Sequence, residues 1–315
     1  MSETVFPWQI SQWQQVQAMR EADRMPHAIL LAGPDGIGKR RFARVLMQTL
    51  VCDEPTGEGA CGQCRECHFG MEHPDLHTVE PPEGKKQIAV DQVRNLVEIC
   101  SKTAHSSGGR KVIQIFPADA MNNNTANALL KTLEEPSGDT VLILVSDAPA
   151  RLLATIRSRC RQMTFPVPER ELAMNWLRVM IPDEHQCAAC LDEMSGRPLA
   201  AKNLFDTDGL EARRQCDQAL AEWFSGAKTL GDTATALLEQ EFEFLLDWLA
   251  QRFHQLFRAS LAGSDMPGPW DGWASRPATR ISQQLDAALE LRAQMQRGVA
   301  LNKRLTLESF LLGWA

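Results

Sequence analysis

The stretch Gly33-Pro34-Asp35-Gly36-Ile37-Gly38-Lys39-Arg40 decides the fold. It follows an apolar run, Ala28 to Ala32, and precedes a segment, Phe42 to Leu46, whose pattern predicts a helix. A strand, a glycine-rich turn and a helix are the context of a phosphate-binding loop, in which backbone amides and a lysine converge on an anion. The candidate nucleotide-binding residues are Gly33, Gly36, Gly38 and Lys39.

Two features of a nucleotide hydrolase are missing. The residue after the loop lysine is normally Ser or Thr, whose hydroxyl ligates Mg²⁺, and here it is Arg40. A hydrolase also carries Asp-Glu at the end of a second buried strand, to hold the metal and orient water. Here that strand, Lys111 to Phe116, is followed by Pro117, and the nearest carboxylate, Asp119, is interpreted as a turn cap. We therefore expect a loop that can still hold phosphate through its amides and Lys39 but does not hydrolyse ATP.

The bulk composition limits the protein class. At 315 residues the chain is long enough for two or three domains. The net charge of −7 weighs against a generally basic nucleic-acid binder. The N-terminal residues lack the basic start and apolar core of a secretory signal, and no run of about 18 apolar residues could span a membrane. We expect a cytoplasmic protein with no membrane among its partners.

A cysteine-rich segment follows the first helix. Its four cysteines have the spacing C-x8-C-x2-C-x2-C and are Cys52, Cys61, Cys64 and Cys67. A C-x2-C pair can grip one ion from a tight turn, and two more thiolates complete a closed tetrahedral shell. The segment is rich in glycine and polar residues, so a metal would hold it together. Scattered free thiols are the alternative. We predict a structural zinc site and place the nearby His68 and His73 outside its ligand shell.

An arginine cluster stands at the exit of a short helix expected over 150–157. Ser158-Arg159-Cys160 is flanked by Arg157 and Arg161. The planar guanidinium suits phosphate because it donates two parallel hydrogen bonds. A surface cluster of salt bridges is the alternative, and the residues alone leave the two interpretations equally open.

The remaining chain is expected to be helical. Pro166-Val167-Pro168 is typical of a linker, residues 169 to 205 are expected to form a compact three-helix unit, and helices continue from Gly209. Cys187 and Cys190 lie in helical sequence without a second pair, so we interpret them as core residues. Asp91 is expected to be the N-cap of a helix that buries Val93 and Leu96.

Several stretches together resemble the delta prime subunits of bacterial DNA polymerase III clamp loaders, which belong to the AAA+ group. The matching stretches are His27 to Gly33, the four cysteines, Asn127 to Pro136, Ser158 to Cys160, and Leu301 to Leu305. The resemblance is strong for residues 25 to 165 and weaker in the helical C-terminal third.

The resemblance implies a fold and a function. The fold would be an α/β AAA+ module over residues 1–166, with a five-stranded parallel sheet, flanking helices and a zinc module at 52–67. A helical lid would cover 167–207 and an oligomerising helical collar 208–315. The chain would be a stator without ATPase activity of its own, in a DNA polymerase holoenzyme. It would assemble with gamma/tau ATPase subunits and delta, to open the sliding clamp and load it on primer-template DNA.

The resemblance also gives Arg159 a role. It occupies the position of the family's arginine finger, which would act in trans on ATP held by a neighbouring subunit. Fingers of this kind are worth about 10³-fold or more in rate. Two alternatives remain from the sequence. An active AAA+ ATPase subunit is favoured by Lys39 and opposed by Arg40, and a zinc-dependent DNA-binding module is opposed by the acidic net charge.

Overall fold

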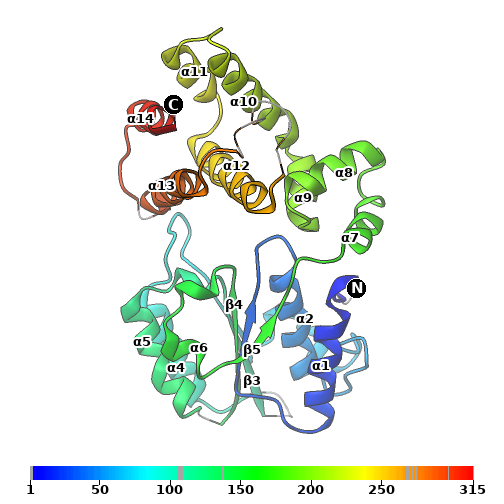
Figure 1. Ribbon diagram of the computed structural model, residues 1–315. Helices are drawn as coiled ribbons and strands as arrows, with labels where there is room; N and C mark the ends of the chain where they lie inside the picture. Colours follow the sequence, from blue (N-terminus) through cyan, green and yellow to red (C-terminus); the bar gives the residue numbers. More distant parts are fainter. Residues whose placement is uncertain are drawn as a thin grey trace. The chain divides into compact units, whose positions relative to one another are not determined.

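The computed structural model describes residues 3–105, 109–136, 138–264, 266, 270, 273, 275–296 and 298–314. The chain divides into two compact units, Met1–Phe205 and Asp206–Ala315, which are described separately (Figure 1). Within the described ranges, no helix combines the length and the apolar character needed to cross a membrane.

The first unit is built on a five-stranded parallel sheet with the order β2-β3-β4-β1-β5. Its strands are β1 (Ala28–Ala32), β2 (Leu76–Val79), β3 (Arg110–Ile115), β4 (Asp139–Ser146) and β5 (Arg161–Thr164). The register places Ala32 beside Ser146 on one side and Thr164 on the other. Because all strands run the same way, the segments that follow them meet at one edge of the sheet. This edge carries the glycine loop.

Helices cover both faces of this sheet (Figure 1). One face carries α1 (Ile10–Glu21) and α2 (Lys39–Val51), and the other carries α4 (Val90–Ser101), α5 (Asn123–Glu134) and α6 (Ala154–Arg157). In β1, Ile29 and Leu31 pack under the first pair, whereas Leu30 packs under the second group. A strand buried on both faces needs an unbroken apolar sequence, which explains the run that precedes the loop. The predicted sheet with flanking helices is confirmed.

Short elements connect this framework. They are η1 (Pro7–Gln9), α3 (Arg65–His68), η2 (Gly70–Glu72), η3 (Ala118–Ala120) and η4 (Pro149–Arg151). The prediction for Asp91 is wrong, because α4 begins at Val90 and its N-cap is Ala89. The N–H of Ala89 donates to the side chain of Gln92 at 2.9 Å, so a glutamine inside the first turn satisfies this end of the helix.

Three small helices complete the first unit: α7 (Arg170–Leu177), α8 (Glu184–Glu193) and α9 (Pro198–Asp206), whose last residue lies at the boundary between the units. Their apolar sides bury Ala173, Leu177 and Leu191. Cys187 and Cys190 are fully buried in α8, which agrees with their interpretation as core residues.

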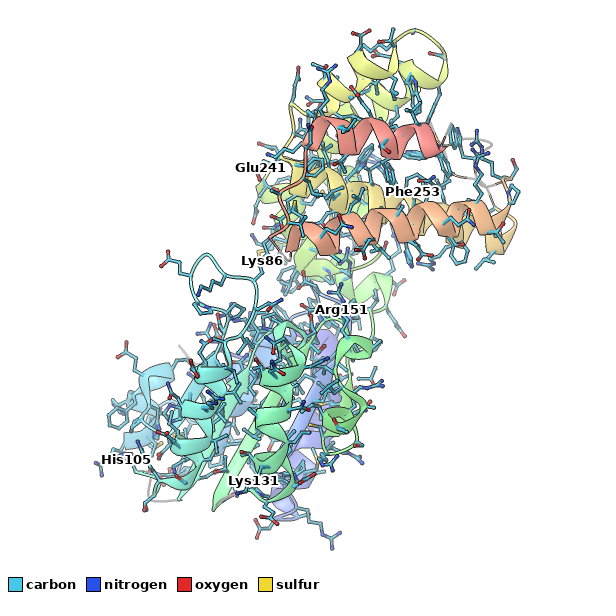
Figure 2. The ribbon with its side chains drawn as sticks, turned by 90° about the vertical axis from the view of Figure 1, so that its left-hand side faces the viewer. Lys86, His105, Lys131, Arg151, Glu241 and Phe253 are labelled. Carbon is cyan, nitrogen blue, oxygen red and sulfur yellow. The ribbon has the colours of Figure 1, made fainter. Side chains whose placement is uncertain are left out.

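The second unit is entirely helical in its described part. It contains α10 (Gly209–Phe224), α11 (Leu230–Leu237), α12 (Phe242–Ala262), α13 (Ala278–Gln296) and α14 (Lys303–Trp314). Phe253 of α12, which is labelled in Figure 2, lies in the core of this unit. Its ring packs edge-on against Trp314 of α14, with ring centroids 4.5 Å apart. The carboxylate of Asp217 accepts hydrogen bonds from Arg252 at 2.6 Å and from the indole of Trp270 at 2.9 Å. A buried polar network of this kind fixes how the surrounding helices pack.

Candidate functional site

The glycine loop joins β1 to α2 and is enclosed from two sides. Gly36 and Gly38 have φ of +78° and +88°, a backbone region that side chains other than glycine rarely adopt. A β-carbon at Gly36 would lie 2.7 Å from Ala200 of α9, and one at Gly38 would lie 2.5 Å from the ring of Phe6. The glycines are therefore needed both for the turn and for the close approach of the N-terminal segment and of α9.

Hydrogen bonds fix these two neighbours to the loop. The N–H of Leu199 donates to the carbonyl of Gly36 at 2.9 Å. The carbonyl of Ile37 accepts from the indole of Trp8 at 3.0 Å and from the side chain of Gln9 at 2.9 Å. The loop is thus held in one conformation by groups that precede and follow it in sequence.

Lys39, the candidate phosphate ligand, is already engaged by its own chain. Its side chain is only 3% exposed, and its Nζ lies 2.6 Å from Oδ1 of Asp147 and 2.6 Å from the carbonyl oxygen of Pro34. Burial raises the pKa of Asp147, while the ammonium of Lys39 acts in the opposite direction. The loop lysine therefore has an internal counterion.

The two positions that lack magnesium ligands contact each other. The guanidinium of Arg40 lies 4.9 Å from the centroid of the Phe116 ring, and the same arginine forms an ion pair with Glu80 at the end of β2. A cation over an aromatic ring is a stabilising contact. Here it replaces a hydroxyl and a carboxylate, so neither residue offers an oxygen to a metal.

Asp119 and Asp147 have roles that their sequence positions did not reveal. The interpretation of Asp119 as a turn cap is wrong, because its Oδ1 accepts hydrogen bonds from Ser146 Oγ at 2.7 Å and from the N–H of Asp147 at 3.0 Å. Sequence reasoning missed Asp147 altogether. The signal that could have found it is its place directly after a buried parallel strand, where ligand-binding residues collect.

Arg159 lies at the opposite edge of the sheet from the loop. It lies two residues before Arg161, the first residue of β5. Because β5 runs parallel to β1 with Arg161 beside Ile29, Arg159 lies where the strands begin. The loop lies where they end, and a strand of four residues spans roughly 13 Å. Figure 2 shows Lys131, in the last turn of α5, at one end of the first unit and Arg151, which follows β4, at the other. Arg159 is thus remote from the loop of its own chain.

The Arg159 side chain is held by neighbouring groups while part of it reaches the surface. Its Nη1 donates to the carbonyl of Thr155 at 3.0 Å, and its Nη2 lies 2.5 Å from Oε1 of Glu134 at the end of α5. The side chain is 34% exposed. Further N–H groups of its fork are therefore available for an outside acceptor.

The four predicted cysteine ligands come together in one cluster. Sγ atoms of Cys52, Cys61, Cys64 and Cys67 all lie within 4.8 Å of one another. The pair Cys52–Cys64 is separated by 3.8 Å and the pair Cys61–Cys67 by 3.9 Å. A tetrahedral zinc shell with bonds of about 2.3 Å places its sulfurs roughly 3.8 Å apart, so the observed spacing fits the ion.

The electrostatics of the cluster also fit a cation. N–H groups of Gln63 and Cys64 point at the sulfur of Cys61 and lower its pKa to about 7. Burial instead raises the pKa values of Cys52 and Cys67. Four thiols in this environment do not all ionise unaided, whereas a bound metal deprotonates its thiol ligands.

Polar contacts attach the cysteine segment to α1 and to the residues that precede β2. The indole of Trp13 in α1 donates to the carbonyl of Gly57 at 2.8 Å. His73 is buried, and its Nε2 lies 2.7 Å from the carboxylate of Glu66, which stands between two of the cysteines. Its Nδ1 accepts from the N–H of Asp75 at 3.0 Å. His73 therefore braces the segment rather than joining the cluster, and His68 also lies outside it.

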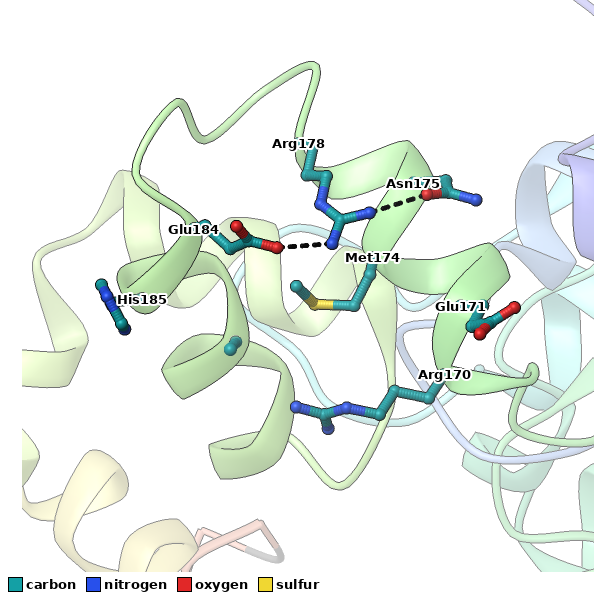
Figure 3. A pocket seen from close by; sticks show the side chains of 8 residues that line it. Arg170, Glu171, Met174, Asn175, Arg178, Glu184 and His185 are labelled. Atoms are coloured by element: carbon teal, nitrogen blue, oxygen red, sulfur yellow. Dashed lines mark hydrogen bonds and ion pairs between the residues drawn. The ribbon is translucent and has the colours of Figure 1, made fainter.

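A hollow of about 590 Å³ lies between α7 and α8 (Figure 3). Its two arginines form ion pairs within the unit. Arg178 binds Asn175 at 2.9 Å and Glu184 at 2.5 Å, and Arg170 pairs with Asp192. The hollow therefore does not present these arginines as unneutralised charges for a ligand.

The parallel sheet, the glycine loop and the small helices that follow define an α/β module of the phosphate-loop type whose loop lacks its metal ligands. The family model described as "DNA polymerase III, delta subunit" matches residues 8–169. The DNA polymerase III subunit delta' of Pseudomonas aeruginosa is 38% identical over 99% of this chain and 97% of that protein. Its counterpart in Escherichia coli K12 is 33% identical over 98% and 94% of the two chains. The chain belongs to the family of DNA polymerase III delta prime subunits.

A further relative connects this chain with another subunit. The DNA polymerase III subunit tau of Salmonella typhimurium is 33% identical over 165 residues, which make up 51% of this chain and 25% of that protein.

Proposed function

We propose that this chain is a stator of the clamp loader of DNA polymerase III. It assembles with gamma/tau ATPase subunits and with delta, and the complex opens the sliding clamp and loads it on primer-template DNA in the cytoplasm. The AAA+ module covers 1–166, the lid 167–207 and the collar 208–315. The likeness to delta prime subunits over nearly the whole chain supports this assembly, and the shared sequence with a tau subunit supports a common architecture.

The distance between Arg159 and the glycine loop of its own chain is the observation that supports a role for Arg159 in another subunit's ATP site. ATP hydrolysis needs a phosphate loop with its metal and a positive group that stabilises the transferring phosphoryl. In this chain Arg40 and Phe116 stand in place of metal ligands, and Arg159 lies at the other edge of the sheet from the loop. The arginine therefore acts as a finger in trans, on ATP that a neighbouring subunit holds.

In that arrangement the chain supplies one donor group to a site completed by its neighbour. The guanidinium of Arg159 approaches the transferring phosphoryl and stabilises the negative charge that develops on it. The contacts to Thr155 and Glu134 set the position from which it does so. An ATPase role for this chain's own loop is opposed by the ion pair between Lys39 and Asp147.

We also propose that the cysteine cluster binds one structural Zn²⁺. Four thiolates close the coordination shell, so the ion would hold the segment 52–67 together and leave no position for a reacting water. The sulfur spacing and the N–H groups directed at Cys61 support this assignment.

The test is ATP hydrolysis by the reconstituted complex of gamma/tau, delta and this chain. Arg159→Ala should assemble normally and slow DNA-stimulated turnover, because one ATP site loses its finger. Arg161→Ala, which removes an exposed arginine two residues away, is the matched control and should leave turnover unchanged. Unaltered turnover in a complex that contains Arg159→Ala would remove the finger from the proposal.

A further inference from the structure

Lys39 of the glycine loop and Asp147 form an ion pair within the first unit. Nζ of Lys39 has one acceptor in the carboxylate of Asp147 and another in the carbonyl of Pro34, both at 2.6 Å. With 97% of the lysine side chain shielded from solvent, the carboxylate occupies the space next to the ammonium where an anionic ligand would have to bind.

The sheet holds Asp147 in this position. Asp147 follows Ser146, the last residue of β4, and Ser146 lies beside Ala32 at the end of β1. The N–H of Asp147 donates to Oδ1 of Asp119 at 3.0 Å, and Ser146 Oγ donates to the same oxygen at 2.7 Å. The ends of β1 and β4 and the carboxylate of Asp119 therefore fix the backbone from which Asp147 reaches the lysine.

The surrounding charges discourage a second anion. Burial is the main effect that disfavours the ionised form of Asp147 and raises its pKa, and Asp35 in the loop and Asp119 add to it as like charges. Lys39 is the group that offsets these effects. A phosphate that bound the lysine would leave the half-buried carboxylate of Asp147 without its cation and would itself face the same acidic groups.

We propose that Asp147 determines the ligand specificity of this loop: its carboxylate acts as a built-in substitute for phosphate at Lys39 and thereby excludes nucleotides. This goes beyond the proposed function, which concerns hydrolysis and the missing metal ligands. Even without Mg²⁺ the amides of the loop and Lys39 could bind a phosphate group, and Asp147 is what prevents it.

The experiment measures binding of inorganic pyrophosphate and of ATP to the full chain by calorimetry. Asp147→Asn keeps the shape of the side chain and removes its charge, and it should bind both probes at least about tenfold more tightly than the wild type, because opposing a like charge at close range is costly. Asp147→Ala should show the same gain, which protects the test against a folding defect of one variant. Pyrophosphate should also raise the unfolding temperature of both variants more than that of the wild type.

Two controls locate the effect. Asp35→Asn removes one exposed charge from the same loop without breaking the ion pair, and its gain in binding should be clearly smaller than that of Asp147→Asn. The double variant Asp147→Asn with Lys39→Ala should lose the gain. The proposal is overturned if wild type and Asp147→Asn bind equally, if Asp35→Asn gives an equal gain, or if the gain survives loss of Lys39. None of these outcomes bears on assembly of the clamp loader, so they separate this inference from the proposed function.

Discussion

Arg159 and Glu134 form an ion pair at the edge of the sheet where the strands begin, with 2.5 Å between Nη2 and Oε1. The two side chains are 34% and 50% exposed. Pairs with this exposure are worth about 0–1 kcal/mol, because solvent screens them and long side chains lose freedom when they pair. The pair therefore orders the guanidinium in the free chain without holding it strongly.

A prediction follows for Glu134. Glu134→Gln should change ATP turnover of the assembled complex by less than about fivefold, since at most about 1 kcal/mol is involved. Glu135→Gln removes the same charge from the neighbouring residue and is the matched control. The measurement is steady-state phosphate release with primed DNA and clamp. A loss as large as that of Arg159→Ala would mean that Glu134 is essential to the finger.

The isolated chain should not hydrolyse ATP. Arg40 and Phe116 supply no side-chain oxygen to Mg²⁺. Arg40→Thr alone should not restore activity, because the end of β3 still lacks the carboxylates that hold the metal and orient water. Phosphate release by purified wild type, Arg40→Thr and Lys39→Ala should be the same. Release by the wild type that disappears in Lys39→Ala would contradict this expectation.

Metal analysis should find one zinc ion per chain, bound by the cysteine cluster. Cys64→Ser should lose the metal and become sensitive to proteolysis within residues 53–63, because the segment has little core of its own. Cys190→Ala is the control, since that cysteine is buried in α8 far along the chain from the cluster. A Cys64→Ser protein with a full zinc content would remove this residue from the ligand set.

The second unit should depend on Asp217 for stability. Asp217→Asn weakens the bonds from Arg252 and Trp270 and removes a negative charge that lies 2.6 Å from a largely buried guanidinium. Discounting for partial exposure, the free energy of unfolding should fall by about 2–3 kcal/mol. Urea denaturation followed by circular dichroism measures the change. The exposed Asp286→Asn should alter stability by less than about 0.5 kcal/mol, and an equal effect of the two would rule out a special role for Asp217.

The local pattern of the sequence was enough for much of the architecture. The apolar run at 28–32 and the glycines after it predict a buried strand and its loop because both have strict local requirements. The cysteine spacing likewise identified the cluster found at Cys52 to Cys67. These features depend on residues that are close together along the chain.

The contacts that occupy Lys39 and replace the metal ligands join residues that are far apart in the sequence. Lys39 meets Asp147 only because β4 lies beside β1, and Arg40 meets Phe116 only because the loop and the end of β3 share an edge. Asp119 was misinterpreted for the same reason, since its partners belong to another strand. Strand order is a tertiary property, and no spacing rule in the sequence gives it.

The aromatic contact between the N-terminal segment and α7 allows the glycine loop to be followed by tryptophan fluorescence. Trp8, which donates to the loop carbonyl of Ile37, lies edge-on to Trp176 of α7 with ring centroids 5.5 Å apart. The chain contains no tyrosine, so its near-ultraviolet emission comes from tryptophan. Replacing Trp176 with phenylalanine and comparing the spectra isolates this pair from the other indoles. The fluorescence of this tryptophan pair therefore reports how α7 packs against the N-terminal segment that is hydrogen-bonded to the glycine loop.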